Sequence, residues 1–313
     1  MEPASELTLE LRAFVEFVAK KGRELYRDLP WRRTYDPYAI WISEVMLQQT
    51  QVSRVDGRWQ RWLERFPTVD ALAAAAPSDV LEEWQGLGYN RRALSVHRAA
   101  QAISEAGGVF PQDPKELVKL PGIGPATAAG IRAFAFNLHG IYLETNVRTV
   151  FLHELYPQAE GVPDSELVPL VELTCPASVE DAADVADAAN VANADSAAND
   201  ATAELTPRSW YYALLDYGAY LKKTIPNPSR RSKSHVKQSR FEGSHRQKRA
   251  ELLRVLLAHK DEGGAVFETL HQELCQIEVN AGRETLDEQV TLGLLEELAK
   301  EGFCQKNNEY WLP

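Results

Sequence analysis

The chain has 313 residues, of which 44% are hydrophobic and 25% charged, and its formal net charge is −11. Such a chain can bury a large core in two or three domains, and it has no apolar run near the roughly 18 to 20 residues of a membrane span and no signal-peptide pattern. We therefore expect a globular, cytoplasmic protein, whose three cysteines are too few for a disulfide framework or a four-thiolate cluster.

Helical periodicity dominates the chain up to about residue 225. Leu11, Phe14 and Val18 form one apolar stripe, and strand patterns are rare before residue 300. The pattern predicts an all-α body over residues 1–225. We expect a six-helix module over about 38–136 and a second helical lobe built from the N-terminal helix with about 137–156 and 207–225.

The stretch "SEVMLQQTQV", residues 43–52, places an acid and a group of amides at opposite ends of an apolar run. Glu44 precedes Val45-Met46-Leu47, and Gln48 and Gln49 follow. An apolar environment penalises a charged carboxyl, so Glu44 can hold a proton near neutral pH. The pattern makes Glu44 a candidate general acid.

The stretch "LVKLPGIGPATAAGIRAFAF", residues 117–136, places Gly122 and Gly124 in a turn between two helices. Backbone N–H groups at the start of the second helix can bind an anion. A helix-hairpin-helix of this kind holds a DNA phosphate without reading sequence. An ordinary helix-turn-helix also needs glycine, so the motif alone leaves both interpretations open.

Another acid follows in "IYLETNVRTVFLHELYP", residues 141–157, where Glu144 and Asn146 stand at a predicted helix start and Arg148 comes next. One carboxyl before the hairpin and one after it could serve acid and base roles between two helical lobes. We therefore take Glu44, Glu144 and Asn146 as candidate catalytic residues.

The negative charge of the chain is concentrated in one segment. Between Pro157 and Pro207 there are eleven acidic residues and no Lys or Arg, so the rest of the chain has a formal charge of zero. Within this segment the Ala-, Asp- and Asn-rich run over 179–204 has no apolar side chain larger than valine. We predict an acidic low-complexity insertion over residues 157–206, disordered or loosely helical.

A basic segment follows, with eleven Lys and Arg between Lys222 and Arg254 against Glu242 and Glu251. This separation of acid from base suits a protein that binds a polyanion, although a solvated charged loop gives the same composition. We assign a basic linker to 226–244.

The last segment, residues 245–313, predicts three helices and a short hairpin around Lys306, which suggests a winged helix. Its third helix is rich in acids and a poor match for phosphates, so a structural or protein-docking role competes with DNA binding.

Four stretches, in this order, resemble the adenine DNA glycosylase branch of the helix-hairpin-helix glycosylase superfamily, which includes endonuclease III. They are "LPWRRTYDPYAIWISEVMLQQTQV", "FPTVDALAAAAPSDVLEEWQGLGYNRRA", "FPQDPKELVKLPGIGPATAAGI" and "ETNVRTV". The similarity covers roughly residues 8–155 and resumes at "SWYYALLDYGAYL". It implies a two-lobed helix-hairpin-helix DNA glycosylase fold and a monomer that acts on double-stranded DNA with a mismatched or damaged base, associated with the nucleoid in a bacterium.

The resemblance also implies roles for single residues. Glu44 matches the general acid that protonates the flipped adenine, Gln48 and Gln49 match residues that contact bases beside the vacated site, and Tyr89 matches an aromatic wedge. Asn90 stands where these enzymes usually carry a second tyrosine. The expected DNA-binding residues are Gln48, Gln49, Tyr89, Gly122, Gly124, Thr127, Arg148, Arg230, Arg231 and Lys233.

The chain departs from the family in its chemistry. Ala126 stands where lyase relatives carry the lysine of a Schiff base, and Glu144 stands where the family has aspartate in a D-G-N context. The adenine enzymes recognise 8-oxoguanine through a C-terminal domain that resembles Nudix hydrolases. The C-terminal segment of this sequence is too short and too helical to match that domain.

The cysteines that would hold an iron–sulfur cluster are also replaced. Lys222, Ser229, Ser232 and Gln238 stand at their four positions, so we expect no cofactor. The basic run that includes Arg230, Arg231 and Lys233 is expected to take over the phosphate-binding task of the cluster loop; a tolerated deletion with exposed cations is the alternative.

These features predict a monofunctional glycosylase of base excision repair that removes adenine opposite G or 8-oxoguanine. A glycosylase that removes uracil, thymine or a deaminated purine from a mispair is the nearest alternative. The other is a DNA-binding protein without catalysis, in which the winged-helix tail supplies the function. The winged helix is also a candidate for binding a protein partner.

Overall fold

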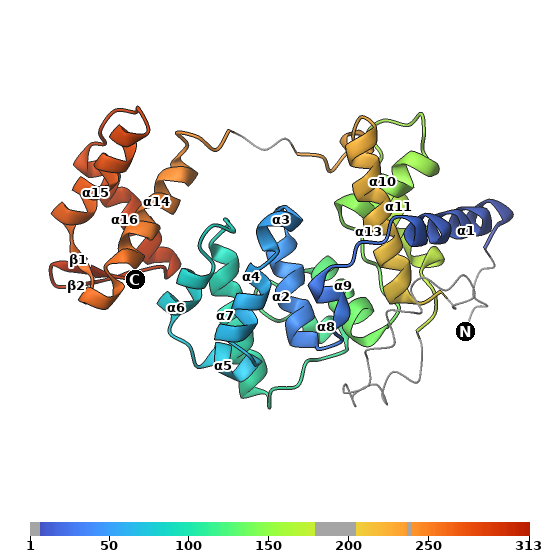
Figure 1. The fold of residues 1–313 in the computed structure, drawn as a ribbon, viewed down its shortest axis with the longest axis horizontal. Helices are drawn as coiled ribbons and strands as arrows, with labels where there is room; N and C mark the ends of the chain where they lie inside the picture. Colours follow the sequence, from blue (N-terminus) through green and yellow to red (C-terminus); the bar gives the residue numbers. More distant parts are fainter. Residues whose placement is uncertain (1–6, 179–204, 237–239) are drawn as a thin grey trace. The chain divides into compact units, whose positions relative to one another are not determined.

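The computed structural model describes residues 7–178, 205–236 and 240–313 (Figure 1). This part of the chain is mostly helical and ends in a domain with a small antiparallel sheet, which confirms the predicted all-α body with an α+β C-terminal domain. The chain divides into two compact units, one made of residues 1–45 and 110–237 and the other of residues 46–109 and 238–313. None of the described helices combines the length and the apolar character needed to cross a membrane.

The first unit is helical. It contains α1 (Leu9–Glu24), η1 (Pro30–Arg33), most of α2 (Pro37–Leu47), α8 (Pro114–Leu117), α9 (Pro125–Phe136), α10 (Thr145–Glu154), α11 (Asp164–Thr174), α13 (Pro207–Thr224) and η4 (Pro228–Arg231).

The second unit contains the helices of residues 46–109 and the C-terminal domain. Its elements are α3 (Val52–Val55), α4 (Arg58–Arg65), α5 (Val69–Ala73), α6 (Pro77–Glu83), α7 (Arg91–Glu105), α14 (His245–Ala258), η5 (Lys260–Glu262), β1 (Ala265–Val266), α15 (Phe267–Asn280), α16 (Glu288–Glu301), β2 (Gln305–Asn307) and β3 (Tyr310–Leu312).

Aromatic packing holds α1, α10 and α13 together in the first unit (Figure 1). The ring centroid of Phe14 lies 5.0 Å from that of Phe151 and 6.1 Å from that of Trp210. Helix α13 starts at a capping box in which the side chains of Thr206 and Ser209 bond each other's backbone N–H groups. The apolar stripe that the sequence predicts on α1 therefore faces the core.

A buried ion pair links η1 to α13. The guanidinium of Arg32 donates to both oxygens of Asp216, at 2.7 and 2.8 Å, and the backbone N–H of Arg27 donates to the same carboxylate at 3.1 Å. The side chains of Asp216 and Arg32 are 0% and 1% exposed. The guanidinium of Arg27 also binds Asp216, at 2.5 Å, so two cations offset the cost of burying this carboxylate, while Asp216 is the counter-charge of the buried Arg32.

The C-terminal domain packs three helices on a sheet with strand order β1-β3-β2, in which both pairings are antiparallel. Its acidic helix α16 binds cations within the same unit, because Glu301 pairs with Arg91 of α7 at 2.6 Å and with Arg249 of α14 at 2.8 Å. At least one of the acids that make α16 a poor match for DNA is thus an ion-pair partner within the second unit.

Two observations bear on the predicted domain boundaries, which remain predictions. Residues 110–136, which include the hairpin, group with the segments on either side of the acidic insertion rather than with residues 46–109. The insertion was expected to begin at 157, but Asp164–Thr174 form α11, where Leu167 and Val171 are buried. Residues 179–204 of the insertion lie outside the described part of the chain.

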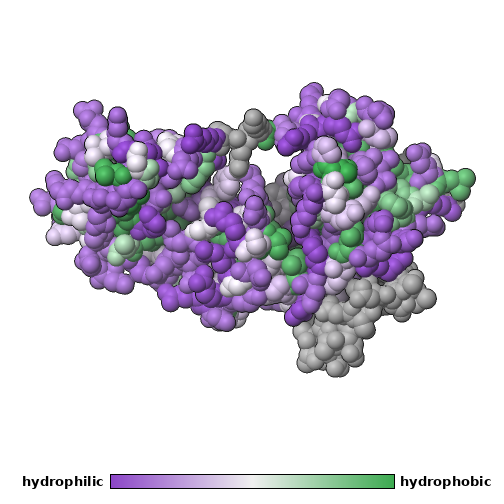
Figure 2. Space-filling model, turned by 45° about the horizontal axis from the view of Figure 1, so that its top comes forward, coloured by the Kyte–Doolittle hydropathy of each residue, from purple (hydrophilic) through white to green (hydrophobic). Residues whose placement is uncertain are grey.

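Hydrophilic residues make up most of the face shown in Figure 2, and hydrophobic residues appear on it only in small groups.

Candidate active site

Glu44 lies in α2, whose neighbouring residues Ser43 and Val45 are buried. Its Oε2 accepts a hydrogen bond of 2.9 Å from the hydroxyl of Tyr142. A Cβ atom built on Gly130 of α9 would lie 2.5 Å from the same oxygen. The carboxyl is therefore held against α9 at a place where only glycine leaves room, while part of the residue stays accessible to solvent.

The surroundings of Glu44 favour its protonated form. Burial raises the pKa of Glu44 to about 7, the hydrogen bond from Tyr142 opposes this rise, the charge of Glu144 adds to it and Arg32 opposes it. A carboxyl with a pKa near 7 is present in both forms at neutral pH, which suits a general acid.

Glu144 is the N-cap of α10, in the same unit. Its Oε1 accepts hydrogen bonds from the backbone N–H groups of Asn146, at 2.6 Å, and Val147, at 3.1 Å. Burial raises the pKa of Glu144, whereas these N–H groups and the cations of Lys222 and Arg148 lower it. The helix N-terminus therefore stabilises a carboxylate close enough to Glu44 to influence its ionisation.

Tyr142 and Gly130 belong to this site but were not identified from the sequence. Tyr142 is buried between Phe134 and Tyr211, with ring centroids 5.3 Å away in both cases, so its hydroxyl needs a partner inside the protein. Gly130 stands inside a helix, where glycine costs about 1 kcal/mol relative to alanine. That cost was the available signal for a close approach at Gly130.

The amide and wedge residues lie on two turns of the second unit. Gln49 has φ +54° and Tyr89 has φ +51°, so both occupy the left-handed region that few non-glycine residues adopt. The Tyr89 residue is 39% exposed. Strained backbone that presents an exposed aromatic ring is typical of functional loops.

One guanidinium fastens both turns. Arg92 donates to the carbonyl oxygens of Gln48, at 2.7 Å, and Gly88, at 3.0 Å, and to the hydroxyl of Thr50 at 3.3 Å. Burial lowers the pKa of Arg92 to about 10, which leaves it charged at neutral pH. No local pattern predicts this clamp, because its partners in the first turn, the Gln48 carbonyl and the Thr50 hydroxyl, lie 44 and 42 positions away along the chain.

The helix-hairpin-helix has the expected geometry for presenting backbone donors. Gly122 has φ +76° and Ile123 is buried. Gly124 is the N-cap of α9, so no side chain caps the first turn of this helix. Thr127, expected among the DNA-binding residues, is only 8% exposed. Most of Thr127 is therefore packed inside the unit, and its contact with DNA stays a prediction.

Two predicted DNA-binding arginines have partners within the protein. Arg148 pairs with both oxygens of Asp164, at 2.9 and 2.8 Å, and Arg231 donates to the carbonyl oxygens of Leu152, at 2.8 Å, and Tyr156. Cations often satisfy the last carbonyls of a helix in this way. Of the predicted basic contacts, Arg230 and Lys233 remain exposed.

The positions that correspond to cluster cysteines do not fit an iron–sulfur cluster. Lys222 donates to the side-chain oxygen of Asn146 at 3.0 Å, the Ser229 hydroxyl donates to Asn227 at 2.8 Å, and Ser232 is buried. Gln238 lies outside the described residues. Within the described ranges, no three His, Cys, Asp or Glu side chains gather as metal ligands would.

Comparison with known proteins agrees with this geometry. Residues 42–167 match the model of the "HhH-GPD superfamily base excision DNA repair protein". Adenine DNA glycosylase of Mycolicibacterium smegmatis is 46% identical over 136 residues, which are 43% of this chain and 46% of that protein. The human adenine DNA glycosylase is 39% identical over 134 residues, which are 40% of this chain and 24% of that protein.

The match therefore spans less than half the length of these relatives. A solved structure of a thermostable thymine-DNA glycosylase shares the fold, with a TM-score of 0.54 and 20% identity over 70% of this chain and 90% of that one. The resemblance inferred from the sequence motifs is confirmed: residues 42–167 match the HhH-GPD superfamily model, and part of the chain is similar in sequence to adenine DNA glycosylases.

Proposed function

We propose that the protein is a monofunctional DNA glycosylase of base excision repair that removes adenine mispaired with G or 8-oxoguanine. The main support for this proposal is the environment of Glu44. Its pKa is raised to about 7, its carboxyl accepts a hydrogen bond from Tyr142, and the charge of Glu144 contributes to the raised pKa. The similarity of this domain to adenine DNA glycosylases supports adenine as the excised base.

In the proposed reaction the target nucleotide leaves the duplex, and Gln48, Gln49 and Tyr89 contact the bases beside the vacated position. Glu44 gives its proton to a ring nitrogen of adenine. The bond between C1′ and the base then breaks, its electron pair goes to the base, and adenine leaves as a neutral molecule. The Glu144 carboxylate stabilises the positive charge at the sugar until water adds to C1′ and loses a proton.

We also propose that the enzyme has no lyase activity and no iron–sulfur cluster. Ala126 in the hairpin offers no amine for a Schiff base. Serines at two of the cluster positions, Ser229 and Ser232, offer no thiolate and are buried within their own loop. The exposed Arg230 and Lys233 are the proposed phosphate contacts of this loop, beside the backbone of the hairpin.

Single-turnover cleavage on a set of duplexes with defined mispairs tests the function. We expect strand breaks at adenine opposite G or 8-oxoguanine that appear only after alkali reveals the abasic site. Release of uracil or thymine instead of adenine would replace the substrate. Binding without release of any base would leave a non-catalytic DNA-binding protein, and breaks without alkali would contradict the absence of lyase activity.

The pH dependence of base release follows from the two carboxyls. Because the protonated form of Glu44 is needed, kcat/KM is expected to fall about tenfold for each pH unit above the pKa of Glu44, near 7. At lower pH the rate falls again as Glu144, whose pKa burial raises, becomes protonated. A rate that stays constant from about one pH unit below the pKa of Glu44 to about two units above it would contradict the assignment.

A further inference from the structure

The first turn of α14 lies beside the wedge residue Tyr89. The guanidinium carbon of Arg246 is 6.0 Å from the centroid of the Tyr89 ring and 5.3 Å from that of Phe241. The guanidinium carbon of Arg92 lies 5.4 Å from the same Tyr89 ring. Two cations, one from each of the two chain segments that form this unit, therefore lie near one aromatic side chain.

This contact is fixed by ion pairs between the C-terminal domain and α6 and α7. The ammonium group of Lys260 binds Asp79 at 2.9 Å and Glu82 at 2.6 Å, and Arg91 binds Glu301 through two hydrogen bonds of 2.6 and 2.7 Å. Helix α14 also packs against α6 (Figure 1). Arg246 is thus brought to Tyr89 by the way the domain docks.

Two acids of the same unit, Glu242 and Glu297, are paired with cations. Glu242 faces Arg283 at 3.5 Å, and Glu297 is paired with Arg249 at 2.7 Å and lies 3.3 Å from His245. Phe241 and Tyr89 are 50% and 39% exposed. Proteins that bind nucleic acids often combine exposed aromatic rings with an arginine, because the rings stack on bases and the guanidinium binds phosphate.

We infer that Tyr89, Phe241 and Arg246 form one DNA-contact surface, through which the first turn of α14 adds a phosphate contact beside the wedge. The inference rests on the proposed function in taking duplex DNA as the substrate. In this arrangement α16 attaches the domain to the rest of the unit, and the start of α14 contacts DNA. In a winged helix the opposite is expected, because a later helix is the one that enters the major groove.

The test is the salt dependence of binding. A guanidinium that neutralises a phosphate releases a counterion, so the slope of log K against log[salt] falls in magnitude by about 1 when it is lost. Fluorescence anisotropy with an adenine-mispaired duplex, between about 50 and 200 mM salt, measures that slope. We expect Arg246→Ala to lower it by about 1 and Arg246→Lys, which keeps the charge, to retain it.

Arg254→Ala is the matched control, because Arg254 lies on the same helix, is exposed, and pairs with Glu251 at 2.6 Å. It removes the same charge from α14 and is expected to leave the slope unchanged. Equal slopes in Arg246→Ala and the unaltered protein, or equal losses in Arg246→Ala and Arg254→Ala, would overturn the inference. Denaturation midpoints of all variants separate loss of contact from loss of folding.

The result stands apart from the test of the proposed function. If the unaltered protein releases no base but Arg246→Ala shows the smaller slope, the DNA surface is supported and the enzymatic proposal fails. If adenine is released and the slope does not change, the surface is wrong and the enzymatic proposal stands.

Discussion

Glu44→Gln is expected to lower the single-turnover rate of adenine release by about 10²- to 10⁴-fold, the usual contribution of a general acid. Glutamine keeps the size of the side chain, the fit against Gly130 and an oxygen that accepts from Tyr142, but its amide cannot donate the proton that the leaving base needs. Rates are measured with the enzyme in excess over an adenine-mispaired duplex, and Kd is measured on the same duplex.

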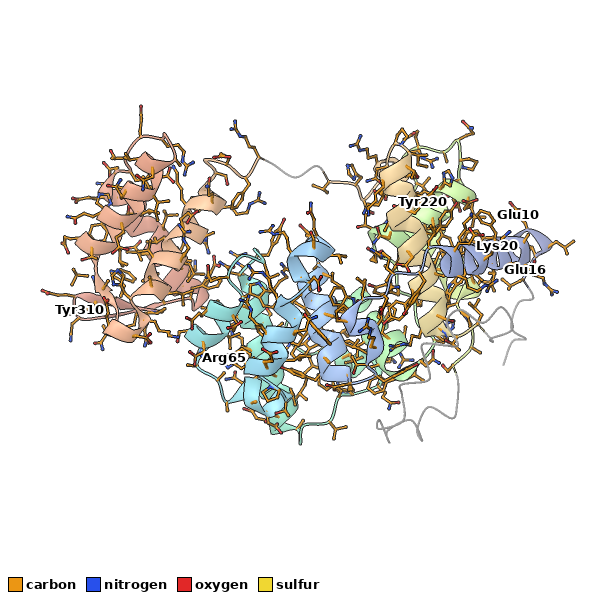
Figure 3. The ribbon with its side chains drawn as sticks, viewed as in Figure 1. Glu10, Glu16, Lys20, Arg65, Tyr220 and Tyr310 are labelled. Carbon is orange, nitrogen blue, oxygen red and sulfur yellow. The ribbon has the colours of Figure 1, made fainter. Side chains whose placement is uncertain are left out.

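Glu16→Gln provides the control, since Glu16 is exposed on α1 (Figure 3) and undergoes the same chemical change. It is expected to match the unaltered protein in both rate and Kd. The mechanism would be wrong if Glu44→Gln released adenine at the unaltered rate. A parallel loss of binding and rate would instead assign Glu44 to the recognition of the substrate.

Asp216→Ala is expected to lower the free energy of unfolding by about 3 to 5 kcal/mol, because it leaves the buried guanidinium of Arg32 without its counter-charge. The Arg32 side chain is 1% exposed, so water cannot readily replace the lost carboxylate. The midpoint of urea denaturation at constant slope reports the change.

The comparison for this variant is Asp28→Ala, which breaks a pair with Arg33 at the surface. The side chains of Asp28 and Arg33 are 56% and 57% exposed, so water replaces the lost partner and no measurable shift of the midpoint is expected. Similar shifts in the two variants would show that burial does not set the strength of the Arg32–Asp216 pair.

The sequence predicted the helical body and the candidate acids because both depend on local patterns. The apolar stripe of α1 and the order of the motifs around Glu44 and Glu144 can be read along the chain. The partner of Glu44 could not be read in this way, since Tyr142 lies 98 positions away, and only the fold brings them together.

The intramolecular partners of other predicted site residues could not be read along the chain either. Arg148 and Arg231 are predicted to contact DNA, and that prediction is untested. Within the protein their partners are Asp164, 16 positions along the chain, and Leu152, 79 positions back. The burial of Thr127 likewise depends on which face of α9 packs in the first unit. Long-range partners decide which polar side chains remain available to a ligand.

The clamp made by Arg92 leaves the chemistry of the two turns open to change. It holds Gln48 and Gly88 through their backbone oxygens, and a carbonyl is present whatever side chain a residue carries. A substitution of the Gln48 side chain therefore keeps the hydrogen bond from Arg92, whereas Gln49, with φ +54°, sits where few residues other than glycine, asparagine and aspartate are unstrained. The two neighbouring amides thus differ in how much change the backbone beneath them tolerates.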